Sequence, residues 1–176
     1  KLNEAFHDAI EESNYRGHYR GVYPIKVNQQ QQVIEGITQF GEKYHFGLEA
    51  GSKPELLAAL AYMHDPEAYI ICNGYKDQEF IDLALQSLQM GLQIVLVVEM
   101  PSELDLILER SAALGIEPIL GIRAKLSTSN NSHWSSSGGE NSVFGLTTSQ
   151  IINAVETLRE HGKLGALQLL HYHQGS

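Results

Sequence analysis

Ile94-Val95-Leu96-Val97-Val98 is apolar at every position rather than at every second one, and this decides the fold class. Successive side chains of a strand point to opposite faces, so a strand of this kind is covered on both faces. Strands buried on both faces are typical of parallel sheets that have helices packed against them. The stretch therefore predicts an α/β protein with a parallel sheet.

Five further short apolar stretches flank this one, and amphipathic helical patterns alternate with them. We expect strands at 22–28, 44–49, 68–72, 93–99, 118–123 and 166–173. We expect helices at 2–14, 31–42, 53–63, 77–90, 102–114 and 148–162. Capping patterns mark three of the helix starts, and these patterns begin at Ser52, Ser102 and Thr147.

The regular spacing of the strand starts, about 22 to 25 residues as far as the fifth strand, favours a (β/α)8 barrel. No Gly-x-Gly-x-x-Gly turn follows the first strand, which argues against a dinucleotide-binding sheet. Such a barrel needs about 250 residues, whereas this chain has 176. We therefore expect a partial TIM-type barrel with about six of the eight strands, in one domain over 1–176 that is truncated at both ends.

The composition is that of an ordinary soluble globular protein, with 43% apolar and 19% charged residues. The formal net charge of −9 argues against a nucleic-acid partner and against binding to an anionic membrane surface. No apolar run reaches the roughly 20 residues that a membrane span needs. The single cysteine, Cys72, cannot form an internal disulfide, which is consistent with the cytoplasm.

Polar residues at the ends of the expected strands are the candidate functional residues, because barrel active sites lie at the C-terminal ends of strands. They are Lys26, Asn28, Glu49, Asn73, Glu99, Arg123, His171, His173 and Ser176. In a strand over 22–28, Lys26 shares a face with Val22 and Pro24, among apolar neighbours. Desolvation there lowers the pKa of a lysine and frees its amine to form a Schiff base with an aldehyde. The alternative is a lysine whose ammonium group simply reaches water.

Two further candidates have more than one interpretation. Glu49 can orient Lys26 or bind a cationic group of a cofactor, or it can simply favour the positive end of the following helix. Glu55 fits a capping role, given its spacing from Ser52. Arg123 suits a phosphate or a phenolate, and a surface ion pair is the alternative.

His171 and His173 lie two residues apart on the last expected strand, so they point to the same face. One interpretation is the metal pair of a metal-dependent hydrolase, although no other metal-binding motif accompanies it. The interpretation that we favour has His173 flat against an aromatic cofactor that Ser176 also contacts, with His171 as a satisfied core histidine. The polar loop Ser127–Gly139, which carries Trp134, is a lid, a phosphate-contacting loop or a plain surface insertion.

Seven segments of the chain carry a resemblance to a known family. They are Gly21–Gln29, Phe46–Leu56, Ile71–Asp77, Gly121–Arg123, Ser137–Glu140, Phe144–Leu146 and His173–Ser176. Together they resemble the biosynthetic arginine decarboxylases, pyridoxal-phosphate enzymes whose barrel is similar to that of alanine racemase and ornithine decarboxylase. Gln174 and Val143 depart from the family pattern, at positions without an assigned role.

The resemblance implies a role for each site residue. Lys26 is the residue that carries pyridoxal 5′-phosphate as a Schiff base, Glu49 lies beside it, and Arg123 lies near the phenolic oxygen of the cofactor. His173 stacks on the pyridine ring and acts with Lys26 in catalysis, and Ser176 contacts the cofactor. No residue is expected to bind a metal, and a Mg²⁺ requirement is implied by the resemblance alone.

The activity that the resemblance implies is decarboxylation of L-arginine to agmatine and CO2 for polyamine and spermidine synthesis, in a cytoplasmic homo-oligomer. Three alternatives stay open. They are decarboxylation of ornithine, lysine or diaminopimelate, a non-catalytic barrel that binds pyridoxal phosphate, and the metal-dependent hydrolase. The family's Gly-rich phosphate loop, the carboxylate for its pyridine nitrogen and its C-terminal β-domain are absent from 1–176. The chain by itself is therefore expected to be inactive.

Overall fold

The computed structural model of the chain describes residues 1–126 and 144–173. Within these residues, six strands form one parallel sheet in the order β1-β2-β3-β4-β5-β6. The strands are β1 (Val22–Pro24), β2 (Gly47–Ala50), β3 (Tyr69–Cys72), β4 (Gln93–Val98), β5 (Ile119–Ala124) and β6 (Leu167–Tyr172). Parallel pairing in sequential order is the arrangement of a (β/α) barrel. The predicted α/β fold with a partial barrel sheet is therefore confirmed.

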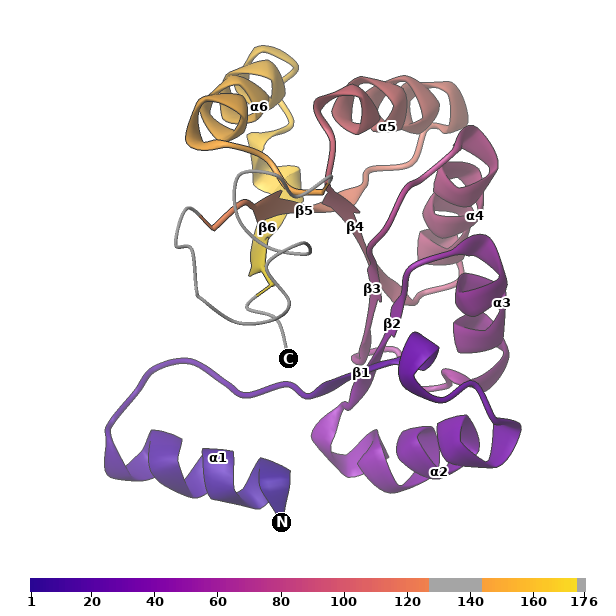
Figure 1. Cartoon of the computed structure of the whole chain (residues 1–176), viewed down its shortest axis with the longest axis vertical. Coiled ribbons are helices and arrows are strands. Elements are labelled where there is room, and N and C mark those ends of the chain that lie inside the picture. The colour runs from indigo at the N-terminus through magenta and orange to yellow at the C-terminus, as the bar shows by residue number, and fades with distance from the viewer. Residues whose placement is uncertain (127–143, 174–176) are drawn as a thin grey trace, which may run out of the picture.

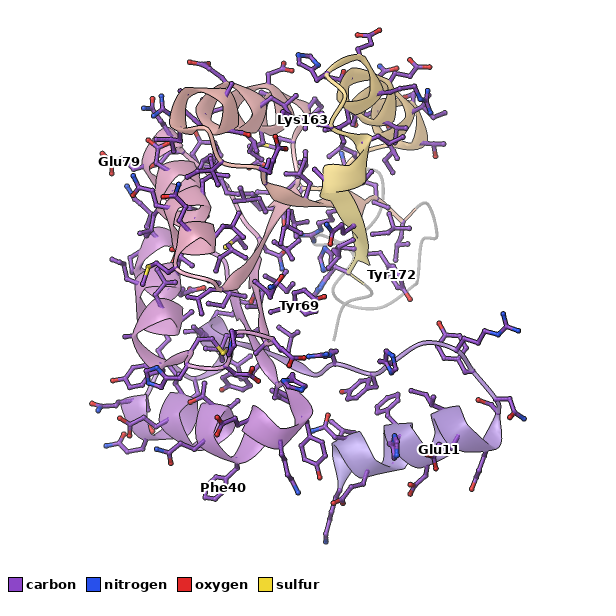
Figure 2. All side chains as sticks on the ribbon, turned by 180° about the vertical axis from the view of Figure 1, so that it is seen from behind. Glu11, Phe40, Tyr69, Glu79, Lys163 and Tyr172 are labelled. Carbon is purple, nitrogen blue, oxygen red and sulfur yellow. The ribbon has the colours of Figure 1, made fainter. Side chains whose placement is uncertain are left out.

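Helices follow the strands and cover one face of the curved sheet (Figure 1). In the described part of the chain they are α2 (Gln31–Gly41), α3 (Lys53–Tyr62), α4 (Gln78–Gln89), α5 (Pro101–Leu114) and α6 (Thr148–Glu160), with short 3₁₀ turns η1 (Ile25–Val27), η2 (Glu42–Tyr44) and η3 (Leu164–Ala166). The first helix, α1 (Leu2–Glu12), is set apart from the others and has no buried residue (Figure 1). Phe40 points from α2 away from the sheet (Figure 2) and is 82% exposed.

Most of the strands pack apolar side chains on both faces, as the stretch Ile94–Val98 predicts. The face toward the helices belongs to the main core, which includes Leu48, Ile70, Cys72, Ile94, Leu96, Val98, Leu120 and Ile122. The opposite, concave face has a smaller cluster made of Ile71, Val95 and Val97, against which Val22, Tyr69, Ile119 and Leu169 pack. Tyr69 is labelled in Figure 2. Because side chains alternate along a strand, this concave face continues into polar residues at the strand ends.

The first strand is shorter than predicted. The sequence pattern predicted a strand over 22–28, but β1 ends at Pro24 and Ile25–Val27 form the 3₁₀ turn η1. A proline has no backbone N–H for the hydrogen-bond ladder, which gives a physical reason for the strand to stop there. The prediction that Lys26 shares a strand face with Val22 and Pro24 was therefore wrong.

Two of the three predicted helix caps are confirmed. The Ser52 hydroxyl accepts a hydrogen bond from the backbone N–H of Glu55 at 3.4 Å. The Glu55 carboxylate in turn accepts one from the backbone N–H of Gly51 at 2.7 Å. The capping role predicted for Glu55 is thus confirmed. Thr147 closes a capping box at the start of α6. The third cap was wrong, because α5 begins at Pro101, before Ser102.

Candidate active site

Polar side chains from successive β/α units lie at the C-terminal end of the sheet. They are Lys26 in η1, Glu49 in β2, Asn73 after β3, Glu99 after β4, Arg123 in β5, and His171 with His173 in and after β6. Parallel strands present their carboxyl ends at one edge, so residues far apart in the sequence meet there. Arg123 and His171 are paired across β5 and β6.

Glu49 is a buried carboxyl group, 7% exposed. Its Oε1 accepts a hydrogen bond from Asn73 Nδ2 at 3.1 Å, whereas its Oε2 is buried and has no hydrogen-bond partner among the described residues. Burial raises the pKa of Glu49, against the opposing effects of the Asn73 hydrogen bond and of the Lys26 charge. Glu49 is therefore a carboxyl group that can hold a proton within electrostatic reach of Lys26.

Arg123 forms a buried ion pair with Glu99. The distance from its guanidinium Nη1 to Glu99 Oε1 is 3.1 Å, and the two side chains are 16% and 0% exposed. The interpretation as a surface ion pair was therefore wrong. Arg123 also lies over the ring of Phe144, with 5.9 Å from its Cζ to the ring centroid. Glu99 Oε2 is buried and lacks a hydrogen-bond partner in the described part of the chain. The ion pair fixes a cation at the strand ends and leaves one carboxylate oxygen available to a ligand.

The positive charges of Arg123 and Lys26 act on both His171 and His173. Burial lowers the pKa of His171, and the charge of Arg123 lowers it further. The more exposed His173 has its pKa lowered by the same two causes in the same order. His171 Nδ1 is buried and has no hydrogen-bond partner within 1–126 and 144–173, so the prediction of a satisfied core histidine was wrong. A neutral imidazole offers one donor and one acceptor nitrogen, and His171 can use Nδ1 for either toward a ligand.

Lys26 is exposed, so the predicted desolvation of its amine was wrong for the chain as described. The buried residue of the turn η1 is its neighbour Ile25. The charge of Lys26 nevertheless lowers the pKa of Glu49, His171 and His173. Lys26 therefore lies within electrostatic reach of the groups at the strand ends, although it comes from a 3₁₀ turn and not from a strand.

Some of the predicted site residues lie outside the described residues. These are Ser176, together with the loop Ser127–Gly139 that carries Trp134. Among the residues that the structure does describe, no three His, Cys, Asp or Glu side chains lie close enough to hold a metal ion. His171 and His173 thus lack, in that part of the chain, the further ligands that a zinc site needs. Every helix in the described part of the chain is too short or too polar to span a lipid bilayer.

The pairing of the site residues is what the sequence did not predict. Asn73 donates to Glu49 and Arg123 donates to Glu99, and each of these pairs is 24 residues apart. This separation matches the spacing of the β/α units. Polar residues that lie one β/α unit apart, at the ends of neighbouring strands, are the sequence signal that identifies both pairs.

Four buried polar atoms without a partner in the described chain gather at this edge. They are Glu49 Oε2, Asn73 Oδ1, Glu99 Oε2 and His171 Nδ1. A buried polar atom without a hydrogen bond costs about 1–3 kcal/mol, so a group of them at strand ends indicates a ligand-binding site. A (β/α) sheet with such a group at its C-terminal edge is typical of the enzymes built on barrel folds.

The family model for the pyridoxal-dependent decarboxylase, pyridoxal binding domain, matches residues 1–176. The chain belongs to this family. It is 51% identical over 176 residues to the biosynthetic arginine decarboxylase of Thermosynechococcus vestitus, covering 100% of this chain and 28% of that protein. The chain thus spans little more than a quarter of the length of this relative.

Solved structures support the same assignment. The biosynthetic arginine decarboxylase from Campylobacter jejuni matches with a TM-score of 0.84 and 36% identity, over 97% of this chain and 27% of that one. An alanine racemase from Clostridium difficile matches with a TM-score of 0.56 and 16% identity, over 89% of this chain and 37% of that one. The second likeness concerns the fold alone. The sheet is therefore that of the alanine racemase-like barrels.

Proposed function

We propose that the full-length protein is a pyridoxal-phosphate-dependent decarboxylase that converts L-arginine to agmatine and CO2. The group of four unpartnered buried atoms within reach of Lys26 and Arg123 carries the proposal of a cofactor site. The identity of 51% to a biosynthetic arginine decarboxylase supports arginine as the substrate. We further propose that the protein takes part in polyamine synthesis and is a cytoplasmic homo-oligomer, as the family resemblance implies.

The residues present fit pyridoxal 5′-phosphate. An exposed lysine amine can bind its aldehyde, and the Arg123 guanidinium can face its phenolic oxygen, because a planar cation pairs well with a localised oxygen anion. In this proposal Lys26 binds the cofactor covalently, and His173 supports the face of its ring. Ser176 contacts the cofactor from outside the described residues.

Bound pyridoxal phosphate supplies an electron sink for the carbanion that forms as CO2 leaves the substrate. The chain's own residues then have electrostatic and proton-holding roles. Glu49 can take up or release a proton at Oε2, since burial raises its pKa. Arg123 keeps a positive charge at the site because Glu99 Oε1 fixes its guanidinium. His171 offers an uncharged nitrogen at Nδ1, because burial and Arg123 both disfavour its protonation.

The test measures CO2 release by the full-length protein, supplied with pyridoxal phosphate, from L-arginine, L-ornithine, L-lysine and diaminopimelate. We expect release from arginine, and loss of both CO2 release and the visible absorbance of bound cofactor in Lys26→Ala. Lys53→Ala is the matched control, because Lys53 follows the neighbouring strand but forms surface ion pairs with Asp77 and Glu79. Release from another amino acid instead of arginine would overturn the substrate. Cofactor absorbance without any CO2 release would overturn the decarboxylase activity.

The same assay tests the Mg²⁺ requirement, which rests on the family likeness alone. Turnover that survives a chelator would remove that requirement. Turnover lost with the chelator, restored by Mg²⁺ and unaffected in Lys26→Ala would instead favour metal chemistry at His171 and His173.

A further inference from the structure

We propose that Glu103 is a positioning residue for the cofactor-binding end of the sheet. Paired with Lys76, it ties together the two connections that hold Asn73 and Glu99 in place. This inference rests on the proposed function, because the groups that it positions are those assigned to the cofactor site. It is a role for a residue of α5 that lies outside that site.

Lys76 and Glu103 form an ion pair from which water is almost fully excluded. The two residues are 1% and 2% exposed. Lys76 Nζ lies 3.3 Å from Glu103 Oε2 and 3.4 Å from Oε1, and it donates to the carbonyl of Gly74 at 2.6 Å. The ammonium therefore binds α5 on one side and the turn directly after Asn73 on the other.

Both oxygens of Glu103 also accept backbone hydrogen bonds from the connections that follow two neighbouring strands. Oε1 accepts from the N–H of Lys76, after β3, at 3.1 Å. Oε2 accepts from the N–H of Glu99, after β4, at 2.8 Å, and from that of Met100 at 3.4 Å. One carboxylate thus fixes the two chain segments relative to each other.

Each of these two segments carries a polar group of the candidate site. Asn73 begins the first segment and donates to Glu49 Oε1. Glu99 begins the second, and its side chain accepts from Arg123. Movement of either segment changes the position of the carboxylate or the cation that depends on it. Glu103 therefore acts on Glu49 through Asn73, and on Arg123 through Glu99.

The pattern of hydrogen bonds distinguishes Glu103 from Glu49 and Glu99, the two carboxylates that face the proposed cofactor site. Glu49 and Glu99 each have a buried oxygen without a partner in the described residues, whereas both oxygens of Glu103 are partnered. A buried ion pair contributes little net stability compared with apolar side chains of the same size. Its better-supported use is to fix one arrangement of the segments that it joins.

The test compares Glu103→Gln with Asp82→Asn in the full-length protein. Asp82 makes a matched control, because its two-point ion pair with Arg110 also links the α4 and α5 units. It does not bind the strand-end connections. A glutamine keeps one acceptor oxygen and loses the other, so one of the two segments is released. The double variant Lys76→Met with Glu103→Gln removes the buried charge pair as a whole, in case the single variant does not fold.

Two measurements are made. The first is hydrogen exchange, by mass spectrometry, of peptides covering 73–76 and 99–100 in protein freed of cofactor. We expect at least one of the two peptides to exchange at least about tenfold faster in the Glu103 variants, and both to be unchanged in Asp82→Asn. The second is steady-state decarboxylation, where we expect kcat to fall by about tenfold to a hundredfold, with KM for arginine changed by less than about threefold.

Equal exchange rates in the Glu103 and Asp82 variants would overturn the proposal. So would a fall in kcat that, in the Glu103 and Asp82 variants alike, is only proportional to the loss of thermal stability. If the wild-type protein releases no CO2 from arginine, the proposed function fails. The exchange experiment still decides whether Glu103 holds the two segments, because it needs neither cofactor nor substrate.

Discussion

The buried carboxyl groups near the strand ends are of two kinds. Glu103 has both oxygens in hydrogen bonds to lysine and backbone N–H groups. Glu49 and Glu99 each have one oxygen that is hydrogen-bonded and one that is buried without a partner in the described chain. Because a buried oxygen without a hydrogen bond is costly, the second kind is the one expected to contact a ligand.

We predict that Glu49→Gln stabilises the full-length protein without cofactor at neutral pH and weakens decarboxylation. Burial raises the folded-state pKa of Glu49 above its ordinary value of 4.5. At pH values between the unfolded-state pKa and the higher folded-state pKa, Glu49 therefore takes up a proton on folding. The free energy of unfolding falls as the pH rises through that window. A glutamine can still accept from Asn73 and has no charge to desolvate. The expected gain in stability is on the order of 1 kcal/mol above the window and close to zero below it.

Thermal unfolding of the cofactor-free protein at about pH 4 and about pH 8 measures this difference. Glu109→Gln is the control, because Glu109 is an exposed residue of α5. A gain of equal size at both pH values would contradict the assigned cause, and so would no gain at the higher pH.

At the residue scale, the sequence predicted which residues lie at the strand ends but not what they contact. A charged residue after an apolar strand is visible in the pattern. The pairing of Glu49 with Asn73, and of Glu99 with Arg123, depends on the register of neighbouring strands. The exposure of Lys26 was missed because it depends on a 3₁₀ turn that replaces the end of the strand.

At the scale of elements, the helices were predicted to within about two residues at each end, which is the ordinary disagreement between methods of defining helix ends. Their boundaries carry local signals, such as the caps at Ser52 and Thr147. Strand starts carry fewer such signals. The second strand was predicted from residue 44 but begins at Gly47, because η2 and the left-handed His45 (φ 52°) precede it.

The turn after β3 gives a prediction at this scale. Gly74 has a φ of +74°, and a Cβ there would lie 2.4 Å from the carbonyl oxygen of Gly51. Gly162 has a similar φ of +67° but open space around it. We predict that Gly162→Ala costs about 1 kcal/mol from backbone strain alone. Gly74→Ala should cost at least about 2 kcal/mol, since the strain and the close approach act together.

Thermal unfolding of the two full-length variants measures these costs. Gly74→Ala should also weaken the binding of pyridoxal phosphate, because the turn carries Asn73. Similar losses of stability in the two variants would show that the close approach to Gly51 has no energetic effect.

At the scale of the whole molecule, the sheet has two edge strands among the described residues, β1 and β6. Leu170 and Tyr172 of β6 are 68% and 55% exposed, and Figure 2 labels Tyr172. An apolar row on an edge strand favours association with other chains or hydrophobic probes. The sequence predicted the parallel sheet because Ile94–Val98 is apolar at every position, as in a strand that is buried on both faces. It did not reveal the exposed face of β6, which carries the apolar Leu170 and Tyr172 beside Gln168.

We predict that a purified 1–176 chain binds a hydrophobic dye and releases no CO2 from arginine. Replacing Leu170 with serine and Tyr172 with threonine should reduce the dye fluorescence of this chain severalfold, because both side chains lie on the exposed row. Dye fluorescence and CO2 release are measured on the same samples. Turnover by the 1–176 chain would contradict the prediction, as would dye binding that the two substitutions leave unchanged.

The measurement that tests the central claim most directly is the position of the cofactor on the chain. The full-length protein is incubated with pyridoxal phosphate, reduced with borohydride and digested for mass spectrometry. The cofactor site described above predicts a phosphopyridoxyl group on the peptide that contains Lys26, and no labelled peptide in Lys26→Ala. A label on Lys76 or Lys125 instead, or no stable label on any lysine, would contradict it.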